Sequence, residues 1–222
     1  DHMGRDILSR VIEGSRVSLI IAASVVGISA VAGLILGMVS GYLGGVVDMV
    51  IMRAVDVLLA FPTIIFALAV STVIGSGQTN LIIAICFIQW TRYARVARGE
   101  TMMLKNAEYI EAARAIGNTA TQIILKYIFP NIISKVIILA SLDIGSIILY
   151  CASLSFLGLG AQPPSPDWGV MISEGKEYMQ YAPWIAVFPG LAIAFSALAF
   201  NMLGDGLRDL LDPRMKESVK AE

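Results

Sequence analysis

The chain has 222 residues, of which 57% are hydrophobic and only 15% are charged, and its mean hydropathy is +0.76. Soluble domains hold about 25% charged residues, so this composition excludes an ordinary soluble domain and predicts an integral membrane protein. The net charge of −1 and the lack of a basic block argue against nucleic-acid binding. Cys86 and Cys151 are far in sequence from the single histidine, His2, so we expect no bound metal.

Five apolar segments are expected to cross the membrane, since about 20 helical residues span about 30 Å of hydrocarbon. They cover residues 17–40, 54–74, 79–91, 131–152 and 183–203. The third segment is the shortest, and it spans only if Arg92 and Arg95 mark its end at the membrane surface. Pro62 and Pro189 lie inside two of the segments and predict kinks there. The predicted fold class is an all-α bundle of membrane helices.

The first segment carries glycine at every fourth position, at Gly33, Gly37 and Gly41. Membrane helices gain little from the hydrophobic effect when they associate, so small residues that allow close approach supply the packing. The stripe therefore predicts a face of the first helix that contacts another helix.

Lysine and arginine side chains gather on one side of the predicted spans. Residues 92–130 and the residues after the fifth span carry most of them, so both regions are predicted to be cytoplasmic. The predicted organisation is an extracytoplasmic segment 1–16, a transmembrane domain 17–204 and a cytoplasmic tail 205–222. The domain holds a cytoplasmic loop at about 99–130 and an extracytoplasmic loop at about 156–182. The outer position of residue 1 predicts at least one further amino-terminal span in the full protein.

A short polar helix is predicted within the basic loop, in the sequence EYIEAARAIG of residues 108–117. Asn106 is its expected N-cap, and Gly117 is expected to end it in a left-handed conformation. Four apolar side chains follow the i, i+3, i+4, i+7 spacing of a single helix face. These are Tyr109, Ala112, Ala113 and Ile116.

The neighbouring residues predict how this loop is organised. Glu111 and Arg114 lie three residues apart and are expected to interact on the helix surface. A second short helix is expected to begin at a capping box formed by Thr119 and Gln122, and Pro130 is expected to end that segment. The residues alone leave two interpretations open: a loop at the membrane interface, or a docking element for a soluble partner.

The same stretch resembles a motif of a known family. EAARAIG at residues 111–117, followed by YIFP at 127–130, is similar to the EAA motif of permease subunits in ATP-binding-cassette importers. Tyr127 and Phe129 replace the isoleucine and leucine of that motif. The resemblance implies that this is the coupling helix, which sits in a groove of the ATP-hydrolysing subunit. The implied coupling residues are Tyr109, Glu111, Ala112, Ala113, Ile116 and Gly117.

Three further stretches narrow the resemblance. They are DHMGRDILSR at residues 1–10, FLGLGAQPPSPDWG at 156–169 and FNMLGDGLRDLLDPR at 200–214. Together they resemble the second, C-type permease subunit of dipeptide, oligopeptide and nickel importers. The implied fold is the helical bundle of a type I importer transmembrane domain.

This resemblance also implies a function and partners. The implied function is ATP-driven import of short peptides by alternating access, in the cytoplasmic membrane of a bacterium or archaeon. The implied partners are a homologous second permease subunit, two ATP-binding subunits and an extracytoplasmic substrate-binding protein. ATP and magnesium are expected on the ATP-binding subunits, and no cofactor is expected on this chain. The alternative is import of nickel or a metal chelate by the same architecture.

The chain lacks the motifs of an enzyme. No G-x-x-x-x-G-K-[ST] phosphate-binding loop occurs in it, and its one histidine has no nucleophile beside it in the sequence. We therefore predict that the chain is not an enzyme and that ATP is hydrolysed on a partner.

Ionisable side chains inside spans are costly and are candidates for function. Asp143 is expected near the middle of the fourth span, where it serves either the translocation path or a structural hydrogen bond. Asp56, three residues from Arg53, is expected at a solvated or paired surface position. A proton-coupled secondary transporter that uses Asp143 and a non-transporting scaffold remain as remote alternatives.

The predicted outer loop is rich in residues that resist regular structure. It holds Pro163, Pro164, Pro166, Asp167 and Trp168. An ordered loop is expected, which either contacts the substrate-binding protein or braces the bundle.

Overall fold

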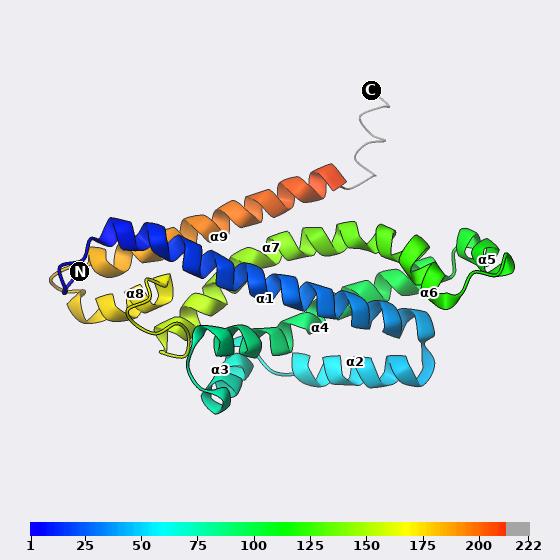
Figure 1. Cartoon of the computed structure of the whole chain (residues 1–222), viewed down its shortest axis with the longest axis horizontal. Coiled ribbons are helices and arrows are strands. Elements are labelled where there is room, and N and C mark those ends of the chain that lie inside the picture. Colours follow the sequence, from blue (N-terminus) through cyan, green and yellow to red (C-terminus); the bar gives the residue numbers. More distant parts are fainter. Residues whose placement is uncertain (212–222) are drawn as a thin grey trace, which may run out of the picture.

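The computed structural model describes residues 1–211, which form helices joined by loops and turns (Figure 1). The predicted all-α fold is confirmed for this part of the chain. Residues 212–222, with Arg214, Lys216 and Lys220 of the predicted tail, lie outside the described part. The helices are α1 (Ile7–Leu43), α2 (Gly45–Leu59), α3 (Thr63–Ile74), α4 (Gln78–Lys105), α5 (Glu108–Ala115), α6 (Ala120–Ile123), a π-helical turn (Ile124–Ile128), α7 (Phe129–Phe156), α8 (Trp168–Gly175), a 3₁₀ turn (Lys176–Tyr178) and α9 (Trp184–Leu211).

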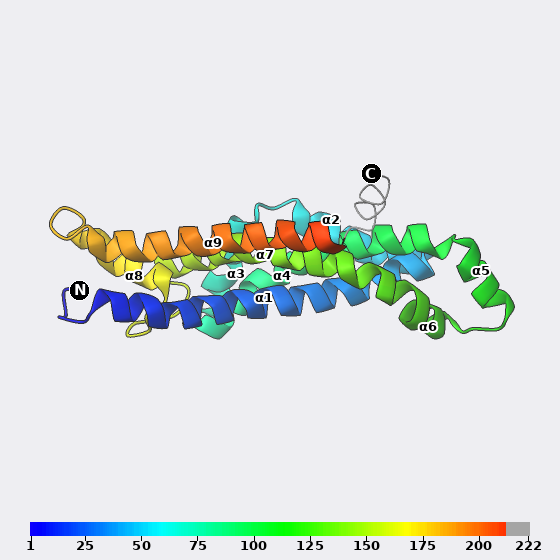
Figure 2. The ribbon, with the colours of Figure 1, turned by 90° about the horizontal axis from the view of Figure 1, so that it is seen from above.

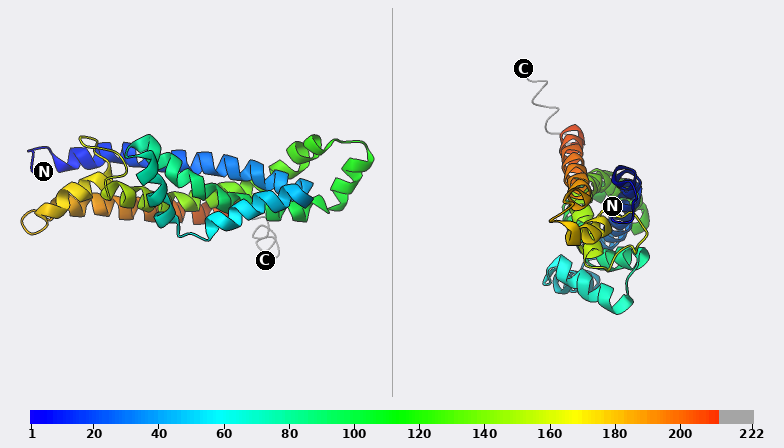
Figure 3. Two further views of the ribbon diagram at one scale, coloured as in Figure 1. Left: turned by 90° about the horizontal axis from the view of Figure 1, so that it is seen from below. Right: turned by 90° about the vertical axis from the view of Figure 1, so that its left-hand side faces the viewer.

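Helices α1, α4, α7 and α9 run along the length of the molecule (Figures 1 and 2). The amino terminus and α8 lie at one end of this bundle, and α5 and α6 project from the opposite end. In the end-on view of Figure 3, α9 and the α2–α3 pair lie on opposite sides of the bundle. The bundle therefore separates two helical caps, one built by α8 and one by α5 and α6.

The predicted number of five spans is not confirmed. Within the described residues, three helical stretches are long and apolar enough to cross a membrane, at residues 7–43, 120–156 and 184–210. The second predicted span, 54–74, is broken: α2 and α3 meet at 94° and qualify only as a bent pair. Pro62 stands directly before α3, and a proline disfavours helical geometry in the residue that precedes it.

Helix α1 begins before the predicted first span. Asp6 caps it, because its carboxylate accepts a hydrogen bond from the backbone N–H of Ser9 at 2.7 Å. Hydrogen bonds from Ser9 lower the pKa of Asp6 below its usual value. The helix therefore begins at Ile7 and includes Arg10 and Arg16, which lie before the uncharged residues that defined the predicted span.

Helix α4 also differs from its prediction, since it continues through the arginines to Lys105 instead of stopping at residue 91. Each arginine of this stretch has a carboxylate partner on another helix. Arg95 bonds Asp56 at 2.8 Å, and Arg98 donates two hydrogen bonds to Asp48 at 2.5 and 2.7 Å. Asp56 is thus paired, as predicted, but with α4 and not with its sequence neighbour. These ion pairs stabilise the charged part of α4 beyond the apolar segment.

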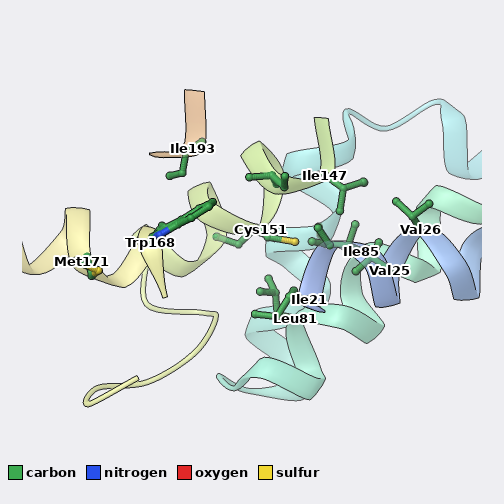
Figure 4. Packing of buried hydrophobic residues seen from close by; sticks show 14 residues of the cluster. Ile21, Val25, Val26, Leu81, Ile85, Ile147, Cys151, Trp168, Met171 and Ile193 are labelled. Carbon is green, nitrogen blue, oxygen red and sulfur yellow. The ribbon is translucent and has the colours of Figure 1, made fainter. Parts of the chain in front are cut away.

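The main apolar core lies in the half of the bundle that contains α8 (Figure 4). It joins side chains of α1, α3, α4, α7, α8 and α9, and Cys151 is one of them, 2% exposed. The buried members shown in Figure 4 include Ile21, Val25, Leu81, Ile85, Ile147, Trp168, Met171 and Ile193. Side chains from six helices pack together there, so this half of the bundle is closely packed.

The predicted glycine stripe is a helix contact, and its partner is α4. A Cβ atom built on Gly33 would lie 2.5 Å from the Tyr93 Cβ atom, and one built on Gly37 would lie 2.4 Å from the Ala94 carbonyl oxygen. A Cβ on Gly41 would lie 2.8 Å from Thr101. The backbones of α1 and α4 therefore approach each other closely over about two helical turns.

The outer loop braces the bundle through residues that the sequence predicted to be irregular. Trp168 starts α8, and its indole N–H donates to the Val11 carbonyl of α1 at 2.9 Å. The buried Asp167 caps α8 and accepts a hydrogen bond from the Ser18 hydroxyl at 3.0 Å. The side chains of Asp167 and Trp168 thus favour bracing over contact with a partner.

Gly37→Ala tests the close contact of α1 with α4, with Gly27→Ala as its matched control. Both changes raise the helix propensity by the same amount. A Cβ atom at Gly37 would meet the backbone of α4, whereas a Cβ atom at Gly27 would meet no atom within 4 Å. We expect Gly37→Ala to destabilise the protein by about 1–3 kcal/mol through overpacking. Thermal unfolding in detergent would measure this, and equal unfolding midpoints for the two variants would contradict the contact.

Candidate functional site

Helix α5 forms the tip of the bundle and has two different faces (Figure 1). Tyr109 is 45% exposed, Ile116 just after the helix is 78% exposed, and Ala112 lies exposed between them. Ile110 and Ala113 are buried, at 0% and 3%. One face of α5 therefore packs on the chain itself, and the other presents apolar side chains outward.

The structure corrects two details of the predicted helix. Ala113 was assigned to the same face as Tyr109, but it lies inside with Ile110, because residues three apart share a face of so short a helix. Asn106 is not the N-cap, since α5 starts after Ala107 with no side-chain cap. The Asn106 amide instead donates to the Met102 carbonyl at the end of α4, at 3.4 Å.

Gly117 ends α5 in the predicted left-handed conformation, with a φ angle of 86°. The Gly117 N–H bonds the Arg114 carbonyl at 2.9 Å, and the Asn118 N–H bonds the Ala113 carbonyl at 3.2 Å. These are the two hydrogen bonds of a Schellman motif. The Asn118 side chain adds a third bond to the Ala113 carbonyl at 3.0 Å, so the end of α5 is fixed in direction.

The turn after α5 leads directly into the next long helix. The predicted capping box of Thr119 and Gln122 is present. Pro130 does not end the segment as predicted, because a π-helical turn precedes it and joins α6 to α7. Proline has no N–H, and the wider turn lets the Phe129 N–H bond the Ile124 carbonyl five residues earlier. Because α6, the π-helical turn and α7 are continuous, a displacement of α6 would also displace the start of α7.

Glu111 and Arg114 do not form the predicted pair. Arg114 folds back, where its guanidinium donates to the Lys105 carbonyl at 3.4 Å and lies 5.7 Å from the ring centre of Tyr42. Glu111 is exposed, and it makes no ion pair within the described residues. The outward face of α5 thus carries an acidic side chain next to the apolar ones.

The inner face of α5 belongs to a second apolar core near that end of the bundle. Ile110 and Ala113 pack in one cluster with residues of α1, α4, α6, α7 and the π-helical turn. The other buried members are Leu34, Met38, Tyr93, Ala97, Ile123, Ile128, Ile132 and Val136. Force applied to α5 would therefore reach α1, α4 and α7 through packed side chains.

Asp143 lies inside the bundle, as predicted, with its side chain 1% exposed. It accepts a hydrogen bond from the Gln89 amide at 3.2 Å and forms an ion pair with Arg92. Both partners come from α4, whereas Asp143 comes from α7. The structure thus supplies partners that sequence reasoning missed, because they are more than 50 residues away along the chain.

Comparisons with known proteins agree with this geometry. A family described as "Binding-protein-dependent transport system inner membrane component" matches residues 33–217. The Glutathione transport system permease protein GsiD of Pectobacterium atrosepticum is 46% identical over 216 residues, which cover 97% of this chain and 72% of that protein. GsiD of Escherichia coli O6:K15:H31 is 49% identical over 216 residues, covering 97% and 71%.

Solved structures share the fold at low sequence identity. A chain of the inward-facing MetNI methionine ABC transporter has a TM-score of 0.72 and 17% identity, and the match covers 92% of this chain and 98% of that one. A chain of an amino acid ABC transporter with histidines has a TM-score of 0.64 and 17% identity, and the match covers 95% and 99%.

The fold and the two-faced tip helix define a membrane-embedded permease subunit of an ATP-binding-cassette importer, not an ATPase. The chain belongs to the family of inner-membrane components of binding-protein-dependent transport systems. The resemblance inferred from the EAA motif is confirmed, as is the multi-pass location in the cytoplasmic membrane.

Gly117→Val, Gly117→Ala and Gly117→Asn test the geometry that directs α5. A Cβ at Gly117 meets no atom within 4 Å, so any loss comes from the positive φ angle and not from a clash. We expect Ala to cost about 1 kcal/mol and the β-branched Val to cost more, while Asn is tolerated best. Limited proteolysis of the α5 segment should show this order of susceptibility, and equal protection of all three variants would contradict it.

Proposed function

We propose that this chain is the permease subunit of an ATP-driven importer for short peptides and that α5 is its coupling helix. The observation that carries the proposal is the division of α5, whose inner face is anchored in the bundle core while its outer face is apolar and uncovered. An apolar face at the tip of a bundle needs a partner, and a groove on an ATP-binding subunit is the partner that the EAA motif implies.

The proposed docking residues are those on the outer side and at the end of the helix. Tyr109, Ala112 and Ile116 would fill the groove, and Glu111 would meet its polar rim. Gly117 would set the direction of the helix, and Ala113 would anchor it from within. The end of the bundle that holds α5 would then be cytoplasmic, and the end that holds α8 would face the substrate-binding protein.

The proposed cycle is alternating access. ATP and magnesium bind to two ATP-binding subunits, whose closure moves α5 together with its groove. The second apolar core transmits this motion to α1, α4 and α7, which rearrange against a homologous second permease subunit. Hydrolysis returns the path to the inside.

The proposed substrates are di- and oligopeptides, with glutathione, itself a tripeptide, within the size range. The named substrate of the two GsiD relatives supports this class. Uptake by the assembled importer should be measured with labelled glutathione, labelled dipeptides and nickel. We expect ATP-dependent uptake of at least one peptide, whereas uptake of nickel alone would contradict the proposal and favour a metal importer. Uptake without the ATP-binding subunits that an uncoupler abolishes would instead favour a proton-coupled carrier.

Glu111→Arg tests the docking role, with Glu177→Arg at the opposite end of the bundle as the matched control. Both acids are exposed, so neither change should unfold the bundle. We expect Glu111→Arg to weaken co-purification with the ATP-binding subunits by about tenfold, since a reversed charge at a docked surface costs about 1.4 kcal/mol or more. The control should co-purify like the wild type. Normal assembly and transport by Glu111→Arg would count against the docking role.

A further inference from the structure

Two arginine side chains of α4 lie on one exposed side of that helix. Tyr93, Ala94 and Ala97 face α1, while Arg92 and Arg95 lie exposed on the side that faces away from it. Exposed side chains along the apolar parts of α1 and α9 are hydrophobic instead. They include Ile28, Val31 and Ile35 of α1 and Leu191, Phe195 and Leu198 of α9.

A guanidinium group that faces lipid at this depth is costly, so the charged side of α4 faces either water or another protein. Arg92 lies about four helical turns from Gln78, where α4 begins. The flanking residues Trp90 and Tyr93 lie against Gly33, well inside the uncharged stretch 17–47 of α1. The aliphatic sides of α1 and α9 suit lipid or a partner helix. The side of α4 that carries Arg92 suits a path for a polar substrate.

Arg92 is held from one side and open on the other. Its Nη1 group pairs with the buried carboxylate of Asp143, and Gln89 bonds the other carboxylate oxygen at 3.2 Å. The Arg92 side chain is nevertheless 54% exposed. A guanidinium has five N–H donors. Within the described residues, the bond to Asp143 is the only hydrogen bond that the Arg92 side chain makes. Donors therefore remain for a ligand.

We propose that Arg92, oriented by Asp143, binds the carboxylate of the peptide substrate on its way through the bundle. The inference rests on the proposed import of peptides. The planar guanidinium can accept Asp143 at one edge and a second carboxylate at another. Asp143 cancels the charge of Arg92 when the path is empty, and its burial fixes the direction of the side chain. Gln89 in turn holds the Asp143 carboxylate.

The position of Arg92 connects this subsite to α5. Tyr93, the next residue of α4, is fully buried in the second apolar core together with Ile110 and Ala113 of α5. A displacement of α5 against this core would therefore shift the α4 turn that carries Arg92. Substrate would then be held or released according to the state of the ATP-binding subunits.

Charge removal at Arg92 is best tested in a variant that leaves no unpaired buried acid. Arg92→Gln alone would strand Asp143, so the test uses the double change Arg92→Gln with Asp143→Asn, which removes both charges and keeps hydrogen-bonding groups. The matched control is Lys135→Gln with Glu100→Gln, which neutralises a second α4–α7 pair joined at 2.5 Å.

The measurement is direct binding to the detergent-purified importer complex, without its substrate-binding protein. The probes are radiolabelled glutathione, an alanine dipeptide and the fully amidated form of each. We expect the wild type to bind at least one free acid about tenfold more tightly than its amide. The Arg92/Asp143 double variant should lose that preference, while the Lys135/Glu100 control should keep it.

Three results would overturn the subsite. These are equal binding of acid and amide by the wild type, no binding of any probe, and an equal loss of preference in the Lys135/Glu100 control. Uptake by the same preparations with the binding protein added separates the two claims. Peptide uptake without any acid preference refutes the subsite and leaves the proposed function standing, whereas absence of peptide uptake refutes the proposed function.

Discussion

The contact between α1 and α4 at Gly33, Gly37 and Gly41 fixes the arrangement of most other elements. A Cβ atom at any of these positions would lie within 2.8 Å of an atom of α4, so neither helix can rotate without separating the two backbones. This contact turns Tyr93 and Ala97 inward and leaves Arg92 and Arg95 on the opposite side. It therefore sets both the second apolar core and the charged side of α4.

The two ends of the bundle are built by different physical means. At the α8 end, an apolar core from six helices and the hydrogen bonds of Asp167 and Trp168 hold α1, α7 and α8 together. At the α5 end, a short helix is attached by Ile110 and Ala113 and directed by the Schellman motif at Gly117. One half of the bundle is closely packed, and the other half carries a protruding helix. This arrangement suits a subunit in which a partner moves the bundle through α5.

Local patterns in the sequence predicted some local features correctly, whereas the Asn106 cap, the Glu111–Arg114 pair and the end at Pro130 were wrong. The positive φ angle of Gly117, the capping box at Thr119 and the spacing of the glycine stripe each depend on residues within a few positions of one another, although the partner of the stripe, α4, lies far along the chain. The break at Pro62 was expected only as a kink, because the size of a bend depends on the helices around it. The continuation of α4 through Arg92 and Arg95 depends on Asp143 and Asp56, which lie on other helices. No local pattern contains those pairings. The face assignment of Ala113 failed for a related reason, since a helix with apolar residues on both sides does not show which side is covered.

The most direct test of the account is photo-crosslinking from the exposed end of α5. A benzoylphenylalanine introduced at Ile116 in the assembled importer should form an adduct with an ATP-binding subunit, because this side chain is 78% exposed at the tip of the bundle. The same probe at Phe195, which is 65% exposed on the side of α9, should form no such adduct. An adduct from Ile116 to the substrate-binding protein, or to lipid alone, would contradict the assignment of α5 as the joint between ATP hydrolysis and transport.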